Sequence, residues 1–276
     1  MHTLSLVMPM MACAVLLWSS SSAAYERAIS LAPNVTELIY AIGAEEALVA
    51  TVKSSNYPPA ALALPRVGDG VSVSAETVLA LQPDVIFAWQ PTRALVALEH
   101  TLAQSGVALH YIHPQSLNEI ADAALQLGDW LNQPEKAAAL SQQWQQQVRQ
   151  LEQTYQSPTP KTVFIALNST PLYTLNDAIS NDVLRVCGAQ NWAQHHQTVV
   201  PAVNVEQLFT APIDGIIYTD MDKPLTRLVT LLNTTQAQPA ATYQVDADQF
   251  YRAGPRLFDA TAALCAQIAQ VPPHEK

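Results

Sequence analysis

The sequence predicts an α/β protein built from two similar α/β lobes with mainly parallel sheets, joined by a single long α-helix. Three observations carry this prediction. Short apolar runs that suit buried strands alternate with segments of helical periodicity, which is typical of parallel sheets covered by helices. A long amphipathic segment interrupts this alternation near the middle of the 276-residue chain. The second half then repeats features of the first half in the same order.

The first half begins with a strand that ends at Pro33, followed by a helix from Asn34 to Gly43. Asn34 is suited to cap the start of this helix, and Gly43 is suited to end it. The other elements expected here are a strand at 48–52, a helix at 76–81, a strand at 84–89, a helix at 95–104 and a strand at 108–113. This order predicts a parallel sheet with helices on both faces.

The central segment predicts one long amphipathic helix. It begins at Pro134, which suits a first helical position, and ends before Pro158. Apolar side chains recur in it at steps of three and four residues: Ala137, Leu140, Trp144, Val148, Leu151 and Tyr155. The helix would contain about 22 residues and be about 33 Å long. Because no Pro or Gly interrupts it, we expect it to resist bending and to permit only small changes of the lobe angle.

Two blocks of the second half align with the first half. Residues 37–44 match residues 182–189 without a gap, and a Glu followed eight residues later by an Asp occurs at Glu76 and again at Glu206. Chance similarity is the alternative, because all βα units obey the same patterning rules. The shared order of the two blocks favours a structural repeat.

The first 24 residues differ from the rest of the chain. An apolar stretch at 4–18 is followed by Ser and Ala, and no charged residue precedes Glu26. This is typical of a secretory signal peptide, and the stretch is short for a membrane span of about 20 residues. The alternatives are a buried N-terminal helix and a lipoprotein anchored at Cys13. We therefore expect a signal peptide at 1–24, an N-terminal lobe at 25–130, a linker helix at 131–158 and a C-terminal lobe at 159–276.

Composition and motifs exclude several functions. Apolar residues make up 49% of the chain, which excludes intrinsic disorder, and the net charge of −10 leaves no electrostatic footprint for nucleic acid. The sequence has no P-loop, no dinucleotide-binding glycine motif, no nucleophile elbow and no His-Glu-x-x-His motif. Cleavage of the signal would leave Cys187 and Cys265, which suggest one disulfide in an exported protein, with two buried thiols as the alternative.

Histidines offer the main route to a metal site. His110 and His113 flank the end of a predicted strand, and His195 and His196 lie in the second half. A zinc or manganese site could draw ligands from both lobes, so a metal-dependent enzyme is one alternative. The adjacent pair has no ligand spacing of its own, because neighbouring side chains diverge. We expect no metal and no intrinsic cofactor, and the roles of His113, His195 and His196 stay open.

Candidate functional residues follow the predicted strands or begin the predicted helices. Tyr57, Trp89, Asp248, Phe250, Tyr251 and Arg252 lie in loops after strands, where open α/β sheets bind ligands. Two such edges facing each other would form a cleft, although ordinary packing is the alternative for each aromatic residue. Glu76 and Glu206 lie in the first turns of two helices, which the helix dipole alone would favour by about 0.3–1 kcal/mol. Alternatively, they form two acidic knobs that dock onto a two-fold symmetric partner.

The sequence resembles the long-helix (class III) family of periplasmic substrate-binding proteins, which serve ABC importers of cobalamin (vitamin B12), ferric siderophores and haem. The resemblance covers residues 27 to about 270. Its family motifs are residues 29–38, 56–59, 75–76 and 81–89. The cobalamin-binding subgroup is indicated by residues 186–191, 205–207 and 248–256 together with Cys265.

This resemblance implies a non-enzymatic periplasmic protein that captures cobalamin or a related corrinoid between its lobes and delivers it to an ABC importer permease. It implies a disulfide between Cys187 and Cys265 and docking of Glu76 and Glu206 onto arginines of the permease. With the strand-end residues, the expected ligand-lining set is Tyr57, Gly70, Trp89, Val200, Asp248, Phe250, Tyr251 and Arg252. We expect a monomer.

Three positions depart from the family pattern. Gly70 and Val200 stand where the family often has a Trp stacked on the corrin ring, and Gln249 stands where a Trp is common. A haem or ferric-siderophore carrier of the same fold is therefore the alternative.

Overall fold

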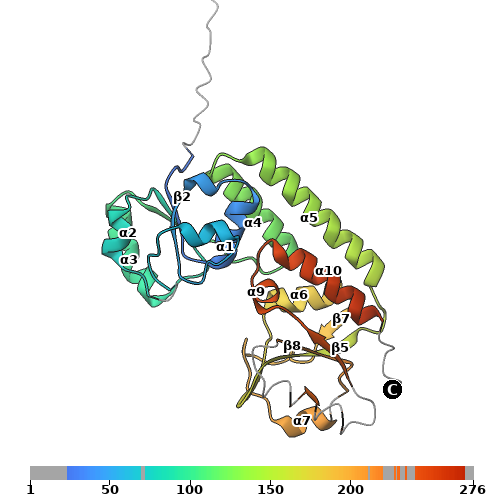
Figure 1. Ribbon diagram of the computed structural model, residues 1–276. Helices are drawn as coiled ribbons and strands as arrows, with labels where there is room; N and C mark the ends of the chain where they lie inside the picture. The colour runs from blue at the N-terminus through green and yellow to red at the C-terminus, as the bar shows by residue number, and fades with distance from the viewer. Residues whose placement is uncertain are drawn as a thin grey trace, which may run out of the picture.

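The computed structural model describes residues 24–69, 72–210, 212–219, 227, 229, 230, 234 and 240–270. Within these residues the chain forms two lobes, each built around one sheet (Figure 1). The first lobe carries β1–β4 and α1–α4, and the second carries β5–β9 with α6, α7, α9 and α10. Residues 1–23 of the expected signal peptide lie outside the described residues.

The first sheet is parallel, with the strand order β2-β1-β3-β4. Neighbouring residues of a strand face opposite sides of a sheet, and here both sides are apolar. Phe87 packs with α1 and α4 on one face, whereas Ile86 packs with α2 and α3 on the other. The strands are β1 (Ala28–Ser30), β2 (Leu48–Thr51), β3 (Val85–Ala88) and β4 (Ala108–Tyr111). The helices are α1 (Pro33–Ala41), α2 (Ala75–Ala80), α3 (Arg93–Gln104) and α4 (Leu117–Trp130), with short 3-10 helices η1 (Glu45–Ala47) and η2 (Pro59–Ala63).

The second sheet has the order β6-β5-β8-β9, and β7 also pairs with β5. Its parallel strands lie in the spatial order β7-β5-β8-β9, so the second parallel strand in the chain lies at the edge beside the first, as in the first sheet. The strand β6 pairs antiparallel with β5. The strands are β5 (Lys161–Ser169), β6 (Leu172–Thr174), β7 (Ala189–Asn191), β8 (Gly215–Tyr218) and β9 (Ala241–Gln244). The helices are α6 (Ala178–Val186), α7 (Val205–Thr210), α9 (Ala247–Phe250) and α10 (Arg256–Ala269). The two similar lobes expected from the sequence are confirmed.

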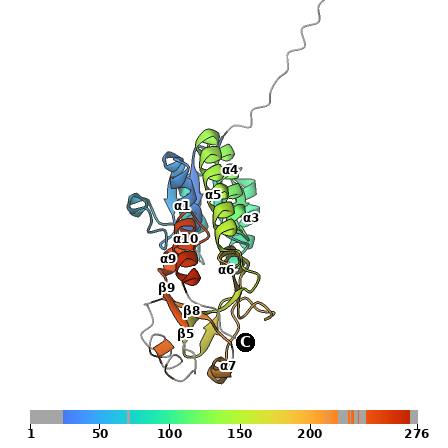
Figure 2. The same ribbon diagram turned by 90° about the vertical axis from the view of Figure 1, so that its right-hand side faces the viewer.

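The long helix α5 (Pro134–Tyr155) has the 22 residues predicted and runs along both lobes (Figures 1 and 2). It forms a helical hairpin with α4, and its far half lies against α10. Trp144 stacks on Phe258 of α10 with 4.6 Å between the ring centroids. One hydrophobic core therefore extends from the first lobe into the second through α5.

The start of α1 differs from the prediction. Its N-cap is Ala32, and Pro33 occupies the first helical position, where the fixed φ of proline suits a helix. Asn34 is therefore inside the helix, and its amide donates to the carbonyl of Ala253 in the other lobe at 3.3 Å. The predicted end is confirmed, since Gly43 has a φ of +71°.

The expected disulfide is confirmed. Cys187, directly after α6, is bonded to Cys265 of α10 and joins the two helices that cover one face of the second sheet. Among the described helices, none is both long enough and apolar enough to cross a bilayer.

Candidate functional site

Several predicted site residues follow the carboxyl ends of parallel strands, although Asp248 lies in the short helix α9 and not in the loop that the sequence predicted. Tyr57 follows β2, Trp89 follows β3, and Asp248 and Arg252 follow β9. Tyr57 is 41% exposed, and Asp248 is exposed to a similar extent, so both side chains are open to solvent. This is the edge of an α/β sheet at which ligands bind.

A buried carboxylate connects the two lobes close to these residues. Glu37 lies on α1 of the first lobe, and Arg252 and Arg256 come from the second lobe. Arg256 Nε donates to Glu37 Oε2 at 2.9 Å and its Nη2 donates to Oε1 at 2.7 Å, while Arg252 Nη1 donates to Oε1 at 3.0 Å. Because only 1% of the Glu37 side chain is exposed, its charge requires such partners. Hydrogen bonding to Glu37 raises the pKa of Arg256 above its ordinary value.

Arg252 extends this buried pair to the exposed surface. Its guanidinium donates to Asn56 Oδ1 at 2.7 Å and to the carbonyl of Ser54 at 3.3 Å, and it pairs with Asp248 at 2.6 Å. The Asn56 amide in turn donates to Asp248 Oδ2 at 2.9 Å. The predicted site residues Asp248 and Arg252 are thus held against the first lobe.

Tyr57 completes the group. The guanidinium of Arg256 lies 4.2 Å from the centre of the Tyr57 ring, a cation–π contact. The two carboxylates of Glu37 and Asp248 balance the two guanidiniums. A molecule at this surface would meet an aromatic ring, an exposed amide and an exposed carboxylate, which together offer apolar contact and hydrogen-bonding groups.

Trp89 and the histidines of the first lobe form two separate aromatic contacts. Trp89 is half-buried and meets the exposed His113 edge-on, with 4.4 Å between the ring centroids. His110 stacks on Trp130 at 4.1 Å, and the Tyr25 hydroxyl lies 3.0 Å from its Nε2. Burial lowers the pKa of His110.

The adjacent His195 and His196 lie in a loop of the second lobe, where the His196 ring is 5.6 Å from that of Trp192. Over the part of the chain that the structure describes, no three His, Cys, Asp or Glu side chains are grouped as a metal site. None of the described histidines is therefore placed as part of such a cluster.

Glu76 and Glu206 occupy the same place in two short helices. Each is the second residue of its helix, α2 or α7, and each is exposed. The Ser74 hydroxyl accepts from the N–H of Thr77 at 3.3 Å, and Asn204 Oδ1 accepts from the N–H of Glu206 at 3.2 Å, so both helix starts are capped. Figure 1 shows α2 and α7 at the outer ends of the two lobes.

Residues 29–255 match a family described as "Periplasmic binding protein". The chain belongs to this family. It is a family of binding proteins rather than of enzymes, and the resemblance seen in the sequence is confirmed.

Named relatives match nearly the full length of the chain. A protein named "Vitamin B12-binding protein" from Pectobacterium carotovorum subsp. carotovorum (strain PC1) is 32% identical over 262 residues, which is 94% of either chain. A protein of the same name from Yersinia pestis (strain Pestoides F) is 31% identical over 250 residues, 90% of this chain and 88% of the relative.

Solved structures agree with this two-lobed fold. The periplasmic vitamin B12 binding protein BtuF of Vibrio cholerae superimposes with a TM-score of 0.76 at 29% identity, covering 89% of this chain and 97% of BtuF. The periplasmic heme-binding protein BhuT, in complex with two hemes, gives a TM-score of 0.74 at 23% identity, covering 90% and 99%. The similarity to BhuT concerns the fold alone.

The remaining predicted lining residues are placed differently. Phe250 is 2% exposed and packs in the hydrophobic core, so it offers no surface to a ligand in this conformation. The hydroxyl of its neighbour Tyr251 is buried without a hydrogen-bond partner among the described residues, and burial, followed by the charge of Asp177, raises the Tyr251 pKa to about 12. Val200 is 47% exposed, and Gly70 lies outside the described residues.

The sequence prediction gave no role to Glu37, Asn56 or Arg256, which the structure brings into the site. One signal was available. Glu37 is a charged residue on a helix whose neighbours Val35, Leu38 and Ile39 are all apolar and buried. A charge in such a helix is almost never buried unless it is paired, so it indicates a buried cation elsewhere in the chain.

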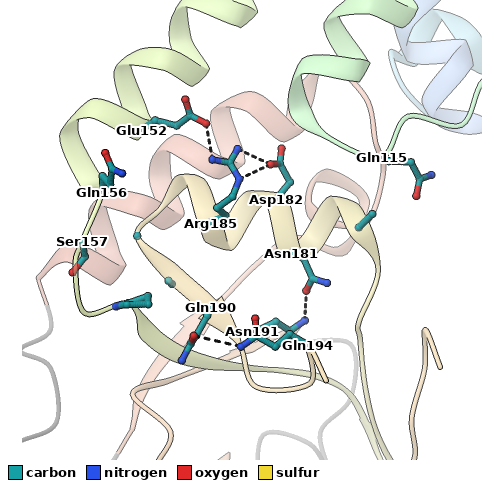
Figure 3. Close-up of a pocket in the computed structure, with 14 residues that line it drawn as sticks. Gln115, Glu152, Gln156, Ser157, Asn181, Asp182, Arg185, Gln190, Asn191 and Gln194 are labelled. Carbon is teal, nitrogen blue, oxygen red and sulfur yellow. Dashed lines mark hydrogen bonds and ion pairs between the residues drawn. The ribbon is translucent and has the colours of Figure 1, made fainter. Parts of the chain in front are cut away.

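A polar pocket of about 760 Å³ lies elsewhere, between α6, β7 and the end of α5 (Figure 3). Its charged side chains satisfy one another, since Arg185 pairs with Asp182 at 2.7 Å and with Glu152 at 2.8 Å. Among the described residues that line it, none belongs to the predicted ligand-lining set. We assign no ligand to it.

Proposed function

We propose that the protein is a substrate-binding protein that captures cobalamin or a related corrinoid and delivers it to the permease of an ABC importer. The observation that carries this proposal is the near full-length similarity to vitamin B12-binding proteins, at 32% identity over 94% of the chain. Membership of a periplasmic binding protein family supports a binding role rather than an enzymatic one.

The proposed cargo site is a cleft between the lobes, at the carboxyl ends of the strands. Cobalamin is a large ring system surrounded by amide groups. Tyr57 and Trp89 provide aromatic surface for such a ring, and Asn56, Asp248 and Arg252 provide hydrogen-bonding groups for amides. Val200 and Gly70 are also part of the proposed lining set, and each offers a ligand less contact area than the Trp residues common in the family.

A haem carrier of the same fold is the second candidate. It is favoured by His113, an exposed imidazole that contacts Trp89 at the end of a strand. Imidazole is a common axial ligand of haem iron.

A titration followed by visible absorbance tests the cargo. Purified protein at micromolar concentration is mixed with cyanocobalamin, haemin or a ferric siderophore, and calorimetry measures the heat of each addition. We expect saturation by one equivalent of cyanocobalamin. Binding of haemin alone would replace the corrinoid proposal with the second candidate, and the variant His113→Ala would then be expected to lose the haem spectrum.

Docking onto the permease is the second part of the proposal. Glu76 and Glu206 are exposed at equivalent positions on the outer ends of the lobes, which suits two basic sockets of a two-fold symmetric permease. Glu76→Arg and Glu206→Arg should leave cyanocobalamin affinity unchanged and abolish its uptake by cells that depend on this protein. Glu135→Arg, which changes an exposed carboxylate in the first turn of α5, is the matched control and should support normal uptake. Normal uptake by both docking variants would contradict the proposal.

The proposal also includes export of the protein, its lobe boundaries and its oligomeric state. Residues 1–24 would direct export to the periplasm and be removed, leaving a monomer with lobes at 25–130 and 159–276 and a linker at 131–158. Mass spectrometry of the protein recovered from the periplasm should give a mature chain that begins at Tyr25. Light scattering should give the mass of one chain, and a dimer would contradict the monomer.

A further inference from the structure

Two carboxylates at equivalent places of the repeat each bond to the opposite lobe. Glu37 is the fifth residue of α1 and Asp182 is the fifth residue of α6, and both helices have nine residues. Each helix is the first of its lobe. The partners are equivalent too, because each group lies at the start of the last helix of the other lobe, α10 or α4.

The Glu37 bridge is ionic. The guanidinium of Arg256, the first residue of α10, binds both oxygens of the carboxylate at 2.7 and 2.9 Å. Arg252 binds the same carboxylate at 3.0 Å and also reaches Asn56 at 2.7 Å. Two arginines of the second lobe are therefore fixed to two side chains of the first lobe.

The Asp182 bridge uses a helix start. Asp182 Oδ2 accepts from the backbone N–H of Leu117, the first residue of α4, at 2.8 Å. This N–H has no partner within its own helix, and an anion there is favoured by the helix dipole. Asp182 Oδ1 is held by Arg185, which also pairs with Glu152 on α5 at 2.8 Å (Figure 3).

The two bridges lie on different sides of the long helix. In Figure 2, α1 and α10 are on one side of α5, and α4 and α6 are on the other. The long helix packs against both lobes and limits their movement, and the two bridges add contacts between the lobes that do not pass through it. A bridge on each side opposes rotation of one lobe against the other, because any movement that separates the lobes must lengthen at least one of the two bridges.

We propose that Glu37 and Asp182 are two interlobe latches that fix the lobe angle when no ligand is bound, and that Glu37 is also a positioning residue that holds Arg252 in place for the ligand. The second half of this statement rests on the proposed function, whereas the first half does not. Separation of the lobes would withdraw Arg252 and Asp248 from Asn56. The polar part of the proposed ligand surface would then come apart in the movement that opens the molecule.

A distance measurement without ligand tests the latches. Val96 in the first lobe and Val199 in the second are 53% and 57% exposed, so each is replaced by a spin-labelled Cys and the label separation is measured by pulsed EPR. We expect one narrow distribution in the labelled parent and a broader or displaced one when Glu37→Gln and Asp182→Asn are combined. An unchanged distribution in the combined variant would overturn the proposal.

The matched control is Asp84→Asn. The Asp84 carboxylate accepts from the backbone N–H groups of Glu26 and Arg27 at 2.7 and 3.1 Å, which lie in its own lobe. This variant loses a comparable hydrogen-bonded charge and should keep the distance distribution of the parent. A shift as large as that of the combined variant would mean that any lost carboxylate loosens the lobes, which would also overturn the proposal.

Ligand release separates positioning from mere stability. Cyanocobalamin should leave Glu37→Gln roughly tenfold faster than it leaves the parent, which corresponds to about 1.4 kcal/mol. It should leave Asp182→Asn at a rate within about twofold of the parent, because Asp182 shares no partner with Arg252 and distant sites act independently. Equal rates for the two variants would overturn the positioning role.

Two further outcomes also bear on the proposal. If Glu37→Gln does not fold by circular dichroism, Arg256→Lys replaces it, since this change keeps the positive charge but removes the fork that binds both carboxylate oxygens. If the parent binds no cyanocobalamin, the proposed function fails, and the ligand-free distance measurement still decides whether the latches exist.

Discussion

Glu37 and Asp182 occupy the same position of the repeat, yet they bond in different ways. The Glu37 side chain is 1% exposed and is held by two guanidiniums, whereas the Asp182 side chain is 12% exposed and binds one backbone N–H of the other lobe. Its second partner, Arg185, is mostly open to solvent. Depth of burial explains the difference, because a carboxylate removed from water needs opposite charge, while one near the surface is still partly hydrated.

The largest expected difference in stability between the lobes comes from the disulfide bond of the second lobe. Cys187 directly follows α6, and the equivalent residue after α1 is the fully buried Ile42, which forms no such bond. Replacing Cys187 and Cys265 together by Ala should lower the free energy of unfolding by about 4 kcal/mol, because the disulfide closes a long loop. Urea unfolding measures this loss. Dithiothreitol should destabilise the parent to a similar extent and leave the double variant unchanged, and an equal effect on both would contradict the prediction.

The second-largest expected difference is in how much each latch contributes to the free energy of unfolding. Glu37→Gln leaves Arg252 and Arg256 without their shared anion in a buried site, so we expect a loss of about 3 kcal/mol in the free energy of unfolding. Asp182→Asn keeps an oxygen acceptor for Leu117 and should lose about 1 kcal/mol. Urea unfolding of both variants at one pH makes the comparison. Equal losses would show that burial does not separate the two sites.

Two glycines at equivalent positions give a smaller contrast. Gly43 and Gly188 end the first helix of each lobe, with φ of +71° and +67°, so an Ala at either position has an unfavourable backbone, at a cost of about 1–2 kcal/mol. A Cβ on Gly188 would also lie 2.0 Å from the carbonyl oxygen of Tyr155, whereas on Gly43 it would meet the flexible end of Lys136. Gly188→Ala should therefore lower the melting temperature more than Gly43→Ala does. The reverse order would contradict this prediction.

Acid should lower the stability of the first lobe more than that of the second lobe. We expect this to be the smallest of the differences between them. His110 on β4 and Tyr243 on β9 occupy equivalent strand positions. Burial lowers the pKa of His110 below its ordinary 6.5, so below that pH the unfolded chain binds more protons and stability falls as the pH decreases. Burial and then Asp214 raise the pKa of Tyr243 to about 12, so Tyr243 does not titrate in this range. Above pH 6.5 the contribution of His110 is fully present.

Urea unfolding between about pH 7 and pH 5 measures this effect. The variant His110→Phe should lose less stability over that interval than the parent. Tyr243→Phe is the control and should follow the slope of the parent. An identical slope for all three proteins would contradict the prediction.

Short strands buried on both faces were predictable because their residues are continuously apolar. The runs around Ile29 and Ile86 illustrate this, and the spacing of apolar residues likewise predicted α5 correctly. The helix α4 was not predicted, although Ser116 and Glu119 carry a capping signal: the Ser116 hydroxyl accepts from the N–H of Glu119 at 3.1 Å. The strands β6 and β7 have three residues each, too few to show a periodic pattern.

The site was predictable only in part. Tyr57, Asp248 and Arg252 were named from the sequence because they follow strands and lie in family motifs, and their roles in ligand binding stay predictions. The pairing of Glu37 with Arg252 and Arg256 joins residues more than 200 positions apart in the sequence, and no local spacing indicates it. Phe250 lies in the same short helix, α9, as Asp248, but whether its ring faces the cleft or the core depends on tertiary packing.

The stacking of Trp144 on Phe258 has a consequence for how the molecule melts. Because this contact belongs to an apolar interior that extends through α5 into both halves, neither half has a complete interior of its own. We therefore expect unfolding to be cooperative over both lobes, so that calorimetry should record one transition and not two. A fragment that ends before α5 would lose the helix that packs against α4 and would expose apolar surface that promotes aggregation.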